Sequence, residues 1–452
     1  MRQNVNLLEG RILPSLVKLA LPITATSLIQ MAYNLTDMIW IGRLGSGAVA
    51  AVGAAGMYSW LANGLAVLCR MGGQVKAAQS LGAGMPQEAG RYARTALSMG
   101  AFLGILYGIL SLALHDPLIG FFQLNSPQVV EDAKLYMMVT CGAIVVNYLN
   151  QIMTGLLTAS GNGTAPFLAT TTGLIVNIVM DPVLIFGIGP FPRWGVLGAA
   201  LATVLAQVIV LGIMVFFARR DGVLFCHIRL RERFRWDYCG HIVRIGLPSA
   251  CQNMIFSGIS MVIARIVAGW GDAAVAVQKV GSQIESISWM AADGFSAAIN
   301  AFTAQNHGAG SRERVRKGYF SALRIVVLWG ILTTLLLVVL PEPLFQIFIT
   351  EEDVIPMGVD YLRILGYSQL FMCLEITTEG AFAGLGKTLP PSVVSILFTS
   401  ARIPMAILLA ATALGLNGIW WSLSLSSIVK GLILIVWFLL YLKKYFPKSA
   451  KN

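Results

Sequence analysis

The sequence predicts an all-α polytopic membrane protein: 12 transmembrane helices in two six-helix lobes related by pseudo-twofold symmetry along the membrane normal. Three observations support this fold class. The 452-residue chain is 56% hydrophobic and only 12% charged, with a mean hydropathy of +0.74, whereas soluble domains carry about 25% charged residues. Apolar runs recur that are long enough to cross about 30 Å of hydrocarbon. The two halves of the chain also resemble each other.

The apolar runs define the expected helices in order. In the first half they cover 13–41, 50–80, 91–114, 131–159, 165–188 and 195–218. In the second half they cover 241–268, 273–303, 317–340, 358–384, 389–414 and 418–442. The first run is too long and too interrupted for a signal peptide, so it is kept as a spanning helix. We therefore expect an N-terminal lobe at 1–218, a cytoplasmic linker at 219–240 and a C-terminal lobe at 241–452.

The distribution of positive charge predicts the orientation. The longest polar connection, Ala218 to Arg244, holds seven arginines. If it lies in the cytoplasm, the cytoplasmic loops and termini carry 23 Lys and Arg and the opposite side carries four, as the positive-inside rule requires. Both termini are then cytoplasmic in a multi-pass protein of the cell inner (cytoplasmic) membrane. The net charge of +11 reflects this topology and not nucleic-acid binding, because the basic residues form no separate domain.

The internal repeat predicts how the lobes are related. "LALP" (19–22) and "QSLGAG" (79–84) recur at one common offset as "IGLP" (245–248) and "QNHGAG" (305–310). "YMMV" (136–139) and "GLLTASGNGTAP" (155–166) recur as "YLRI" (361–364) and "GAFAGLGKTLPP" (380–391), with an offset that is smaller by a single position. Each copy has an even number of spans, so both copies enter the membrane from the same side and the axis that relates them follows the membrane normal. This arrangement is typical of an alternating-access carrier with a site between its lobes.

The candidates for that site are the charged residues that we assign to the membrane-buried part of the spans. The acids are Asp37, Asp181, Glu285, Asp293, Glu375 and Glu379. The basic residues are Arg70, Arg265, Lys279, Arg402 and Lys430. A charge near the bilayer centre costs about 2.5 to 3.5 kcal/mol on insertion scales, so such groups are expected to be functional or paired.

The N-terminal lobe carries two acids among amides and hydroxyls. Ser27, Gln30, Asn34 and Asp37 are spaced by three, four and three residues and therefore share a helix face. Asn177 and Asp181, four apart, share another, and the span at 131–159 offers Asn147, Asn150, Gln151 and Thr154. We interpret this lobe as a site that binds and releases a proton or a monovalent cation. The alternative is a hydrogen-bonded network that only holds the helices together.

The C-terminal lobe is expected to contribute to a substrate cavity. Arg402 is placed by the repeat to reach Glu375 or Glu379 and neutralise it. Glu285 and Asp293 either form a second acidic surface for a cationic substrate or pair with Lys279, Arg70 or Arg265. The predicted cavity residues are Asn34, Glu285, Asp293, Glu375, Glu379 and Arg402.

Several segments together resemble the multidrug and toxic compound extrusion (MATE) transporters, and the DinF-type branch in particular. They are "LALPITATSLIQMAYNLTDMIWIGRLG", "QSLGAG", "GLLTASGNGTAP" and "NIVMDPVLIFG". The resemblance covers nearly the whole chain. It is weaker for the NorM branch, which relies on acids of the seventh and tenth helices, since the seventh span here has no acid.

The resemblance implies a function and a set of residues. It implies efflux of small organic, cationic or amphipathic compounds by a monomer, driven by H⁺ or Na⁺ without another cofactor, with the first span bending near Pro22. The ion-coupling residues it implies are Gln30, Asp37, Asn150, Asn177, Asp181 and Thr203. Sodium, if it is the ion, would bind at Asp37, Asn177 and Asp181, and no other metal is expected.

Two other functions fit the sequence less well. A lipid-linked oligosaccharide flippase shares this lobed architecture but favours a strongly basic cavity, whereas the spans here hold six acids and five basic residues. An integral-membrane enzyme needs nucleophiles, histidines or metal ligands that converge on one face. The four histidines lie in loops or at span ends, so we expect no enzymatic activity.

Overall fold

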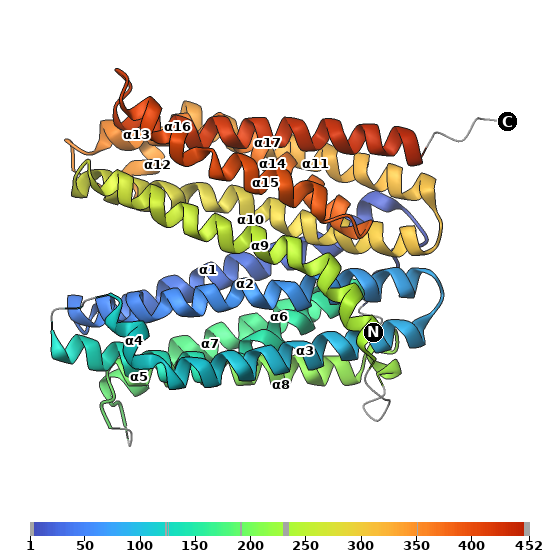
Figure 1. The fold of residues 1–452 in the computed structure, drawn as a ribbon, viewed down its shortest axis with the longest axis horizontal. Helices are drawn as coiled ribbons and strands as arrows, with labels where there is room; N and C mark the ends of the chain where they lie inside the picture. The colour runs from blue at the N-terminus through green and yellow to red at the C-terminus, as the bar shows by residue number, and fades with distance from the viewer. Residues whose placement is uncertain are drawn as a thin grey trace. The chain divides into compact units, whose positions relative to one another are not determined.

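The computed structural model describes residues 4–122, 124, 126–189, 192–228, 235–349 and 351–446, and all structural statements refer to these. The secondary structure of the first half is a series of helices (Figure 1). They are α1 (Ile12–Gly42), α2 (Ser46–Gly82), α3 (Pro86–Ala113), α4 (His115–Gly120), α5 (Pro127–Gly142), α6 (Ile144–Ala159), α7 (Thr164–Phe186) and α8 (Val196–Arg219).

The second half repeats this order. It contains η1 (Phe225–His227), α9 (Trp236–Ala268), α10 (Asp272–Gly308), α11 (Arg312–Val339), α12 (Pro341–Gln346), α13 (Ile355–Gly366), α14 (Gln369–Gly384), α15 (Leu389–Ser400), α16 (Arg402–Ala410) and α17 (Leu416–Tyr445). The twelve expected spans are confirmed, each as one long helix or as two consecutive helices. Nine segments of the described ranges are long and apolar enough to cross a membrane on those grounds alone. Residues 229–234 of the expected linker lie outside the described part of the chain.

The chain divides into two compact units that do not coincide with the lobes expected at 1–218 and 241–452. Among the described residues, unit 1 contains Ala25–Ala250 with Asn4 and Val5, and unit 2 contains Asn6–Thr24 and residues 251–446. The difference arises within α1 and α9, because the first part of α1 packs in unit 2 and the first part of α9 packs in unit 1.

The two changes of unit occur at equivalent positions of the repeat. The second parts of α1 and α9 begin at Ala25 and Cys251, which are separated by the same offset as "LALP" and "IGLP". Ala25 and Cys251 each lie three positions after a proline inside the same helix, Pro22 in α1 and Pro248 in α9. Proline removes one helical hydrogen bond and kinks a helix, so each helix is weakened next to the point at which it leaves one unit for the other.

Close backbone packing holds the exchanged helix parts. In unit 1 a Cβ atom added at Gly246 of α9 would overlap the carbonyl group of Leu68 on α2. In unit 2 a Cβ atom at Gly294 of α10 would overlap Thr24 of α1, whose hydroxyl donates to the carbonyl oxygen of Ala291 over 3.5 Å. Glycine is therefore needed where these helices meet.

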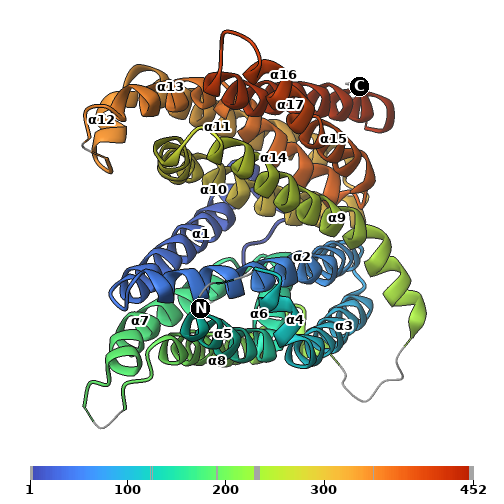
Figure 2. The same cartoon turned by 60° about the vertical axis from the view of Figure 1, so that its left-hand side comes forward.

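Central helices organise each unit, α2 and α8 in unit 1 and α14 in unit 2. In unit 1, α2 packs against α3, α5 and α6, and α8 packs against α5, α6 and α7 (Figure 2). In unit 2, α14 packs against α10, α11 and α17. The core of unit 1 is apolar and includes Ile41, Met137 and Ile185, and that of unit 2 includes Phe345, Leu362 and Trp420.

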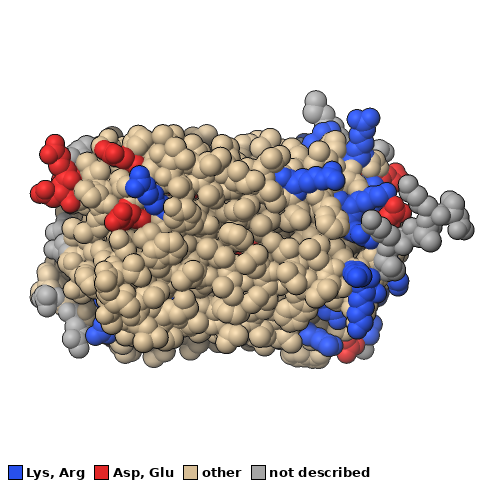
Figure 3. Space-filling view, turned by 90° about the horizontal axis from the view of Figure 1, so that it is seen from above, with Lys and Arg blue, Asp and Glu red and all other residues tan. Residues whose placement is uncertain are grey.

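Surface charge in unit 2 is separated along the helices. Figure 3 shows a face on which Lys and Arg gather at one end and most Asp and Glu at the other, with a wide band between them that shows little charge. The basic end includes the start of α11 and the end of α17, with Arg312, Arg314, Arg316, Lys317, Lys443 and Lys444. The acidic end includes Glu342, Glu351, Glu352, Asp353 and Asp360. Such a band suits a helix bundle that crosses hydrocarbon.

The segment before α1 is held on unit 2 through its backbone. Arg314 of α11 donates hydrogen bonds to the carbonyl oxygens of Leu7, Glu9 and Gly10, at 3.3, 2.9 and 3.0 Å. Asn306 of α10 donates to the carbonyl oxygen of Leu7 over 3.0 Å, and the Leu7 side chain is buried. The start of α1 is thus fixed to α10 and α11.

Candidate functional site

The two acids of unit 1 are buried and interact with each other. Asp37 lies in the part of α1 that belongs to unit 1 and is 9% exposed, while Asp181 and its neighbour Asn177 on α7 are fully buried. When both are ionised, the carboxylates of Asp37 and Asp181 repel each other. The structure therefore brings together the predicted acids of α1 and α7.

The oxygens of these residues have few hydrogen-bond donors. Asn177 Nδ2 donates to Asp181 Oδ1 over 3.0 Å. Asp37 Oδ1, Asn177 Oδ1 and Asp181 Oδ2 are buried and have no hydrogen-bond partner within the described part of the chain. A buried acceptor without a donor costs about 1–3 kcal/mol. A proton or a cation that binds these oxygens would remove that cost and the repulsion between the acids.

Two tyrosines that the sequence analysis did not select complete this group. The hydroxyl oxygens of Tyr33 on α1 and Thr203 on α8 are buried and have no hydrogen-bond partner within the described part of the chain, and Tyr33 lies within electrostatic range of Asp37 and Asp181. Tyr136 of α5 is buried and also interacts with both acids. Tyr33 precedes Asp37 by one helical turn, and Tyr136 begins the repeated "YMMV" segment, so both carried a signal in the sequence.

The other predicted ion-site residues differ in their placement. Asn150 of α6 donates to the carbonyl oxygen of Gln207 over 2.9 Å, which places it against α8 one turn beyond Thr203. Gln30 and Asn34 are exposed, so the polar face predicted for α1 is buried only at Asp37. The regular spacing places these residues on one helix face, but burial along a helix depends on its neighbours, which the spacing does not contain.

Among the six acids of the spans, Glu285 in unit 2 is held by neutral donors. Its Oε1 accepts a hydrogen bond from Tyr361 of α13 and its Oε2 accepts one from Gln369 of α14, both at 3.1 Å. The expected alternative, pairing with a basic residue, is therefore not what the structure describes. Asp293, two turns later on α10, is exposed.

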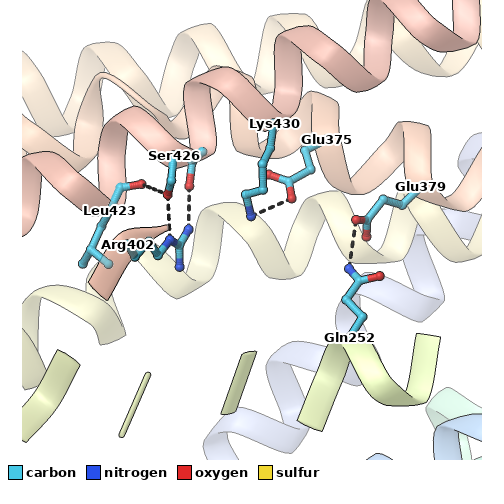
Figure 4. A network of polar contacts seen from close by, with 8 residues as sticks. Gln252, Glu375, Glu379, Arg402, Leu423, Ser426 and Lys430 are labelled. Carbon is cyan, nitrogen blue, oxygen red and sulfur yellow. Dashed lines mark hydrogen bonds and ion pairs between the residues drawn. The ribbon is translucent and has the colours of Figure 1, made fainter. Parts of the chain in front are cut away.

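Four further charged residues of unit 2, Glu375, Glu379, Arg402 and Lys430, lie in a row of polar contacts (Figure 4). Lys430 of α17 forms an ion pair with Glu375 of α14 over 2.8 Å. Gln252 of α9 donates to Glu379 over 2.9 Å. The contact expected between Arg402 and one of these acids is replaced by the Lys430 pair.

Arg402 has different partners. Its Nε donates to Ser426 over 2.6 Å and its NH2 nitrogen donates to Ser427 over 3.0 Å, both on α17. The guanidinium group also lies 5.8 Å from the centre of the Phe256 ring. The repeat placed Arg402 on the correct helix but could not determine which way its long side chain turns.

Metal-ligating side chains do not cluster in the ranges the structure describes: no group of three or more His, Cys, Asp or Glu is placed to hold a metal ion. The oxygens near Asp37 and Asp181 come from two carboxylates, an amide and hydroxyls. Such a set can accept a proton, and carboxylate, carbonyl and hydroxyl oxygens also suit a hard monovalent cation.

The sequence matches a known family twice. The sequence model of the MatE family matches residues 22–183 and 248–408. The starts of the two matched segments, and likewise their ends, are separated by the same offsets as the copies of the internal repeat. Both matches begin at the proline that precedes the change of unit, Pro22 or Pro248.

Curated relatives match over most of their length. "Probable multidrug resistance protein NorM" of Thermotoga maritima is 29% identical over 94% of this chain and 91% of its own. "FAD transporter" of Shewanella oneidensis is 26% identical over 81% of this chain and 80% of its own.

Solved structures share the fold. A structure described as the outward-facing conformation of a multidrug resistance MATE family transporter of the MOP superfamily has a TM-score of 0.89 at 25% identity, covering 99% of both chains. Structures of MATE in the bent and the straight conformation have TM-scores of 0.90 and 0.88 at 25% and 26% identity, each covering 98% of both chains.

Proposed function

Because this chain belongs to the MatE family, whose members are transporters and not enzymes, we propose that it is a secondary active exporter of small organic compounds. Its substrates are cationic or amphipathic, and their efflux is coupled by alternating access to inward movement of H⁺ or Na⁺. The names of relatives as multidrug resistance proteins support the substrate class. The observation that carries the coupling is the set of buried acceptor oxygens of Asp37, Asn177 and Asp181 without donors in the described ranges.

The location of the site supports a link between ion binding and conformation. Asp37 lies on α1, the helix that changes from unit 2 to unit 1 after Pro22. An ion that neutralises Asp37 and Asp181 removes their repulsion and so changes the free energy of this part of α1 relative to α7. Coupling requires that the ion binds one conformation more tightly than the other. Similar proteins have been solved in structures described as the bent and the straight conformation of MATE, which supports a fold with more than one conformation.

The same proposal includes an orientation and an assembly state. We place the protein as a monomer in the inner membrane with both termini in the cytoplasm. The gathering of Lys and Arg at one end of unit 2 supports this orientation, because positive charge is retained on the cytoplasmic side. The DinF-type branch is proposed on the same residues, since that resemblance locates coupling in the N-terminal half.

Dye efflux from proteoliposomes tests the proposal. A pH gradient and a Na⁺ gradient are imposed separately on the wild type, on Asp37→Asn and on Asp116→Asn. Asp116 is a matched control, an exposed acid of α4 whose pKa is held below its usual value mainly by a hydrogen bond from Lys134. We expect one gradient to drive efflux by the wild type and by Asp116→Asn, and Asp37→Asn to show only passive leakage.

Efflux by Asp37→Asn at the wild-type rate would contradict coupling at this site. Absence of wild-type transport under both gradients would contradict the exporter itself, and lipid-linked oligosaccharides would be tested next. Size-exclusion chromatography and thermal unfolding of Asp37→Asn establish that the variant is folded.

A further inference from the structure

The ion pair of Glu375 and Lys430 is enclosed within unit 2. The two side chains are 6% and 5% exposed and belong to α14 and α17, which pack together. Removing two charges from water costs several kcal/mol for each ion, and a buried pair often repays no more than this cost. Stability alone therefore gives little reason for a lysine and a glutamate here.

The ion pair involves only one of the two carboxylate oxygens of Glu375. Lys430 Nζ contacts Glu375 Oε1, while Glu375 Oε2 is buried and has no hydrogen-bond partner among the residues described. Glu379 follows one turn later on the same face of α14 and accepts one hydrogen bond, from the neutral Gln252. The carboxylates of Glu375 and Glu379 thus have a single lysine as counter-ion. Their oxygens without a hydrogen-bond donor could bind a second positively charged group.

Arg402 does not supply this second positive group. Two of its nitrogens are bonded to Ser426 and Ser427. In Figure 4 the guanidinium group lies beside these serines, whereas Lys430 extends towards Glu375 and lies between Arg402 and Glu379 in the row.

We propose that Lys430 is a displaceable internal counter-ion, and that the cationic group of the transported compound takes its place at Glu375. This inference rests on the proposed export of organic cations. When the site is empty, Lys430 pairs with Glu375. When the cation binds Glu375, Lys430 turns to Glu379. If Glu379 carries a proton at that point, the proton is released to water. Carboxylates one helical turn apart are about 5–6 Å from each other at Cβ, a distance that the flexible four-carbon stem of lysine spans.

The exchange explains how a buried carboxylate can bind a cation and still release it. A buried carboxylate without a counter-ion would bind an organic cation more tightly than one that already has a counter-ion. Competition by Lys430 lowers the affinity, because each cation that binds must first break an existing ion pair. A neutral compound breaks no pair and gains nothing from Glu375, so Lys430 affects the affinity for cations only.

Equilibrium binding to the purified full-length protein in detergent, at fixed pH and ionic strength, tests this role. The probes are tetraphenylphosphonium, a permanent cation, and triphenylphosphine oxide, a neutral compound of similar shape. We expect Lys430→Met to bind tetraphenylphosphonium at least about tenfold more tightly, the lower end of measured couplings between close charge pairs. Its affinity for triphenylphosphine oxide should not change.

Three further variants separate the exchange from general effects. Lys430→Arg should bind the cation more weakly than the wild type, because a guanidinium can bond both carboxylate oxygens at once. Lys430→Met/Glu375→Gln/Glu379→Gln should bind it no more tightly than Glu375→Gln/Glu379→Gln. Lys279→Met, which removes a different lysine of unit 2 from the exposed face of α10, should bind like the wild type.

Unchanged cation affinity in Lys430→Met, or an equal gain for both probes, would overturn the proposal. A gain that persists when Glu375 and Glu379 are both replaced by Gln would overturn it as well. Should Lys430→Met not fold, the weakened binding expected of Lys430→Arg decides the question. The assay uses no ion gradient, so it is independent of coupling. Wild-type dye efflux together with Lys430 variants that bind normally would refute this inference and leave the proposed function standing.

Discussion

Tyr136 and Tyr361 occupy equivalent positions of the repeat, as the first residues of "YMMV" and "YLRI", and each lies beside carboxylates of its own unit. Tyr361 donates a hydrogen bond to Glu285, and Tyr136 is buried within electrostatic range of Asp37 and Asp181. The acids themselves are not equivalent in the repeat. The two units therefore share a buried phenol next to negative charge and differ in which helices supply that charge.

The hydrogen bond from Tyr361 should contribute measurably to stability. Tyr361→Phe leaves Glu285 Oε1 without its donor, and we expect the free energy of unfolding to fall by about 1–3 kcal/mol. Tyr367→Phe is the matched control, since Tyr367 is 46% exposed and stacks on Trp421. It should change stability by less than about 0.5 kcal/mol. Equal melting temperatures for the two variants would show that Glu285 does not depend on this donor.

Asp37 and Asp181 should behave as one functional unit. Asp181→Asn is expected to abolish gradient-driven efflux as completely as Asp37→Asn, because the two carboxylates interact and lie in one buried group. The double variant should be no slower than either single variant, since residues that act together are not additive. Initial rates in proteoliposomes measure this. A double variant with a rate equal to the product of the two single effects would indicate separate sites.

The close approach of α9 to α2 should not tolerate a side chain. Gly246→Ala places a methyl group against the Leu68 carbonyl and is expected to cost about 1–3 kcal/mol of stability. Gly258→Ala in the same helix is the control, because no atom lies within 4 Å of a Cβ added there. It should leave stability unchanged or raise it by up to about 1 kcal/mol through helix propensity. Thermal unfolding in detergent compares them, and similar values would contradict the packing described.

Arg314 should control how firmly the segment before α1 is held. Arg314→Ala removes the donors to the carbonyl oxygens of Leu7, Glu9 and Gly10, so hydrogen exchange of residues 6–10 should become faster. Arg316→Ala on the same helix is the control, since Arg316 lies over the Phe320 ring instead. Mass spectrometry of the N-terminal peptide measures the difference. Equal exchange in both variants would show that Arg314 does not hold the segment.

The helices of this protein were predictable because hydropathy reports directly on what crosses a membrane. The positions at which these helices are interrupted were not predictable. The span expected at 389–414 is broken at Ala401, and the span at 131–159 is broken at Ala143, neither of them a proline or a glycine. Ala401 precedes Pro404 by three residues and Ala143 follows Gly142, yet Pro22 and Pro248 lie inside unbroken helices, so such residues alone do not predict a break. No sequence pattern indicated that the first parts of α1 and α9 belong to the opposite unit, because that depends on packing between helices.

The site was predicted where one helix contains the information. Asn177 and Asp181 are four residues apart, and their hydrogen bond follows from helix geometry alone. Tyr33 and Tyr136 were missed because an aromatic residue in an apolar span resembles ordinary packing. Lys430 was recognised as an intramembrane charge, but its pairing with Glu375 depends on how α17 faces α14, which spacing along one helix cannot give.

The exchange of helix parts between the units also has consequences for whether the chain can be split and for how it evolved. A fragment that ends before α9 lacks the helix part that packs on α2 around Gly246. The complementary fragment lacks Asn6–Thr24, which packs in unit 2. Split halves should therefore assemble only when they are produced together, each donating one arm to the other. A single six-helix ancestor would have formed the same arrangement as a domain-swapped homodimer, and gene fusion would have made the swap permanent.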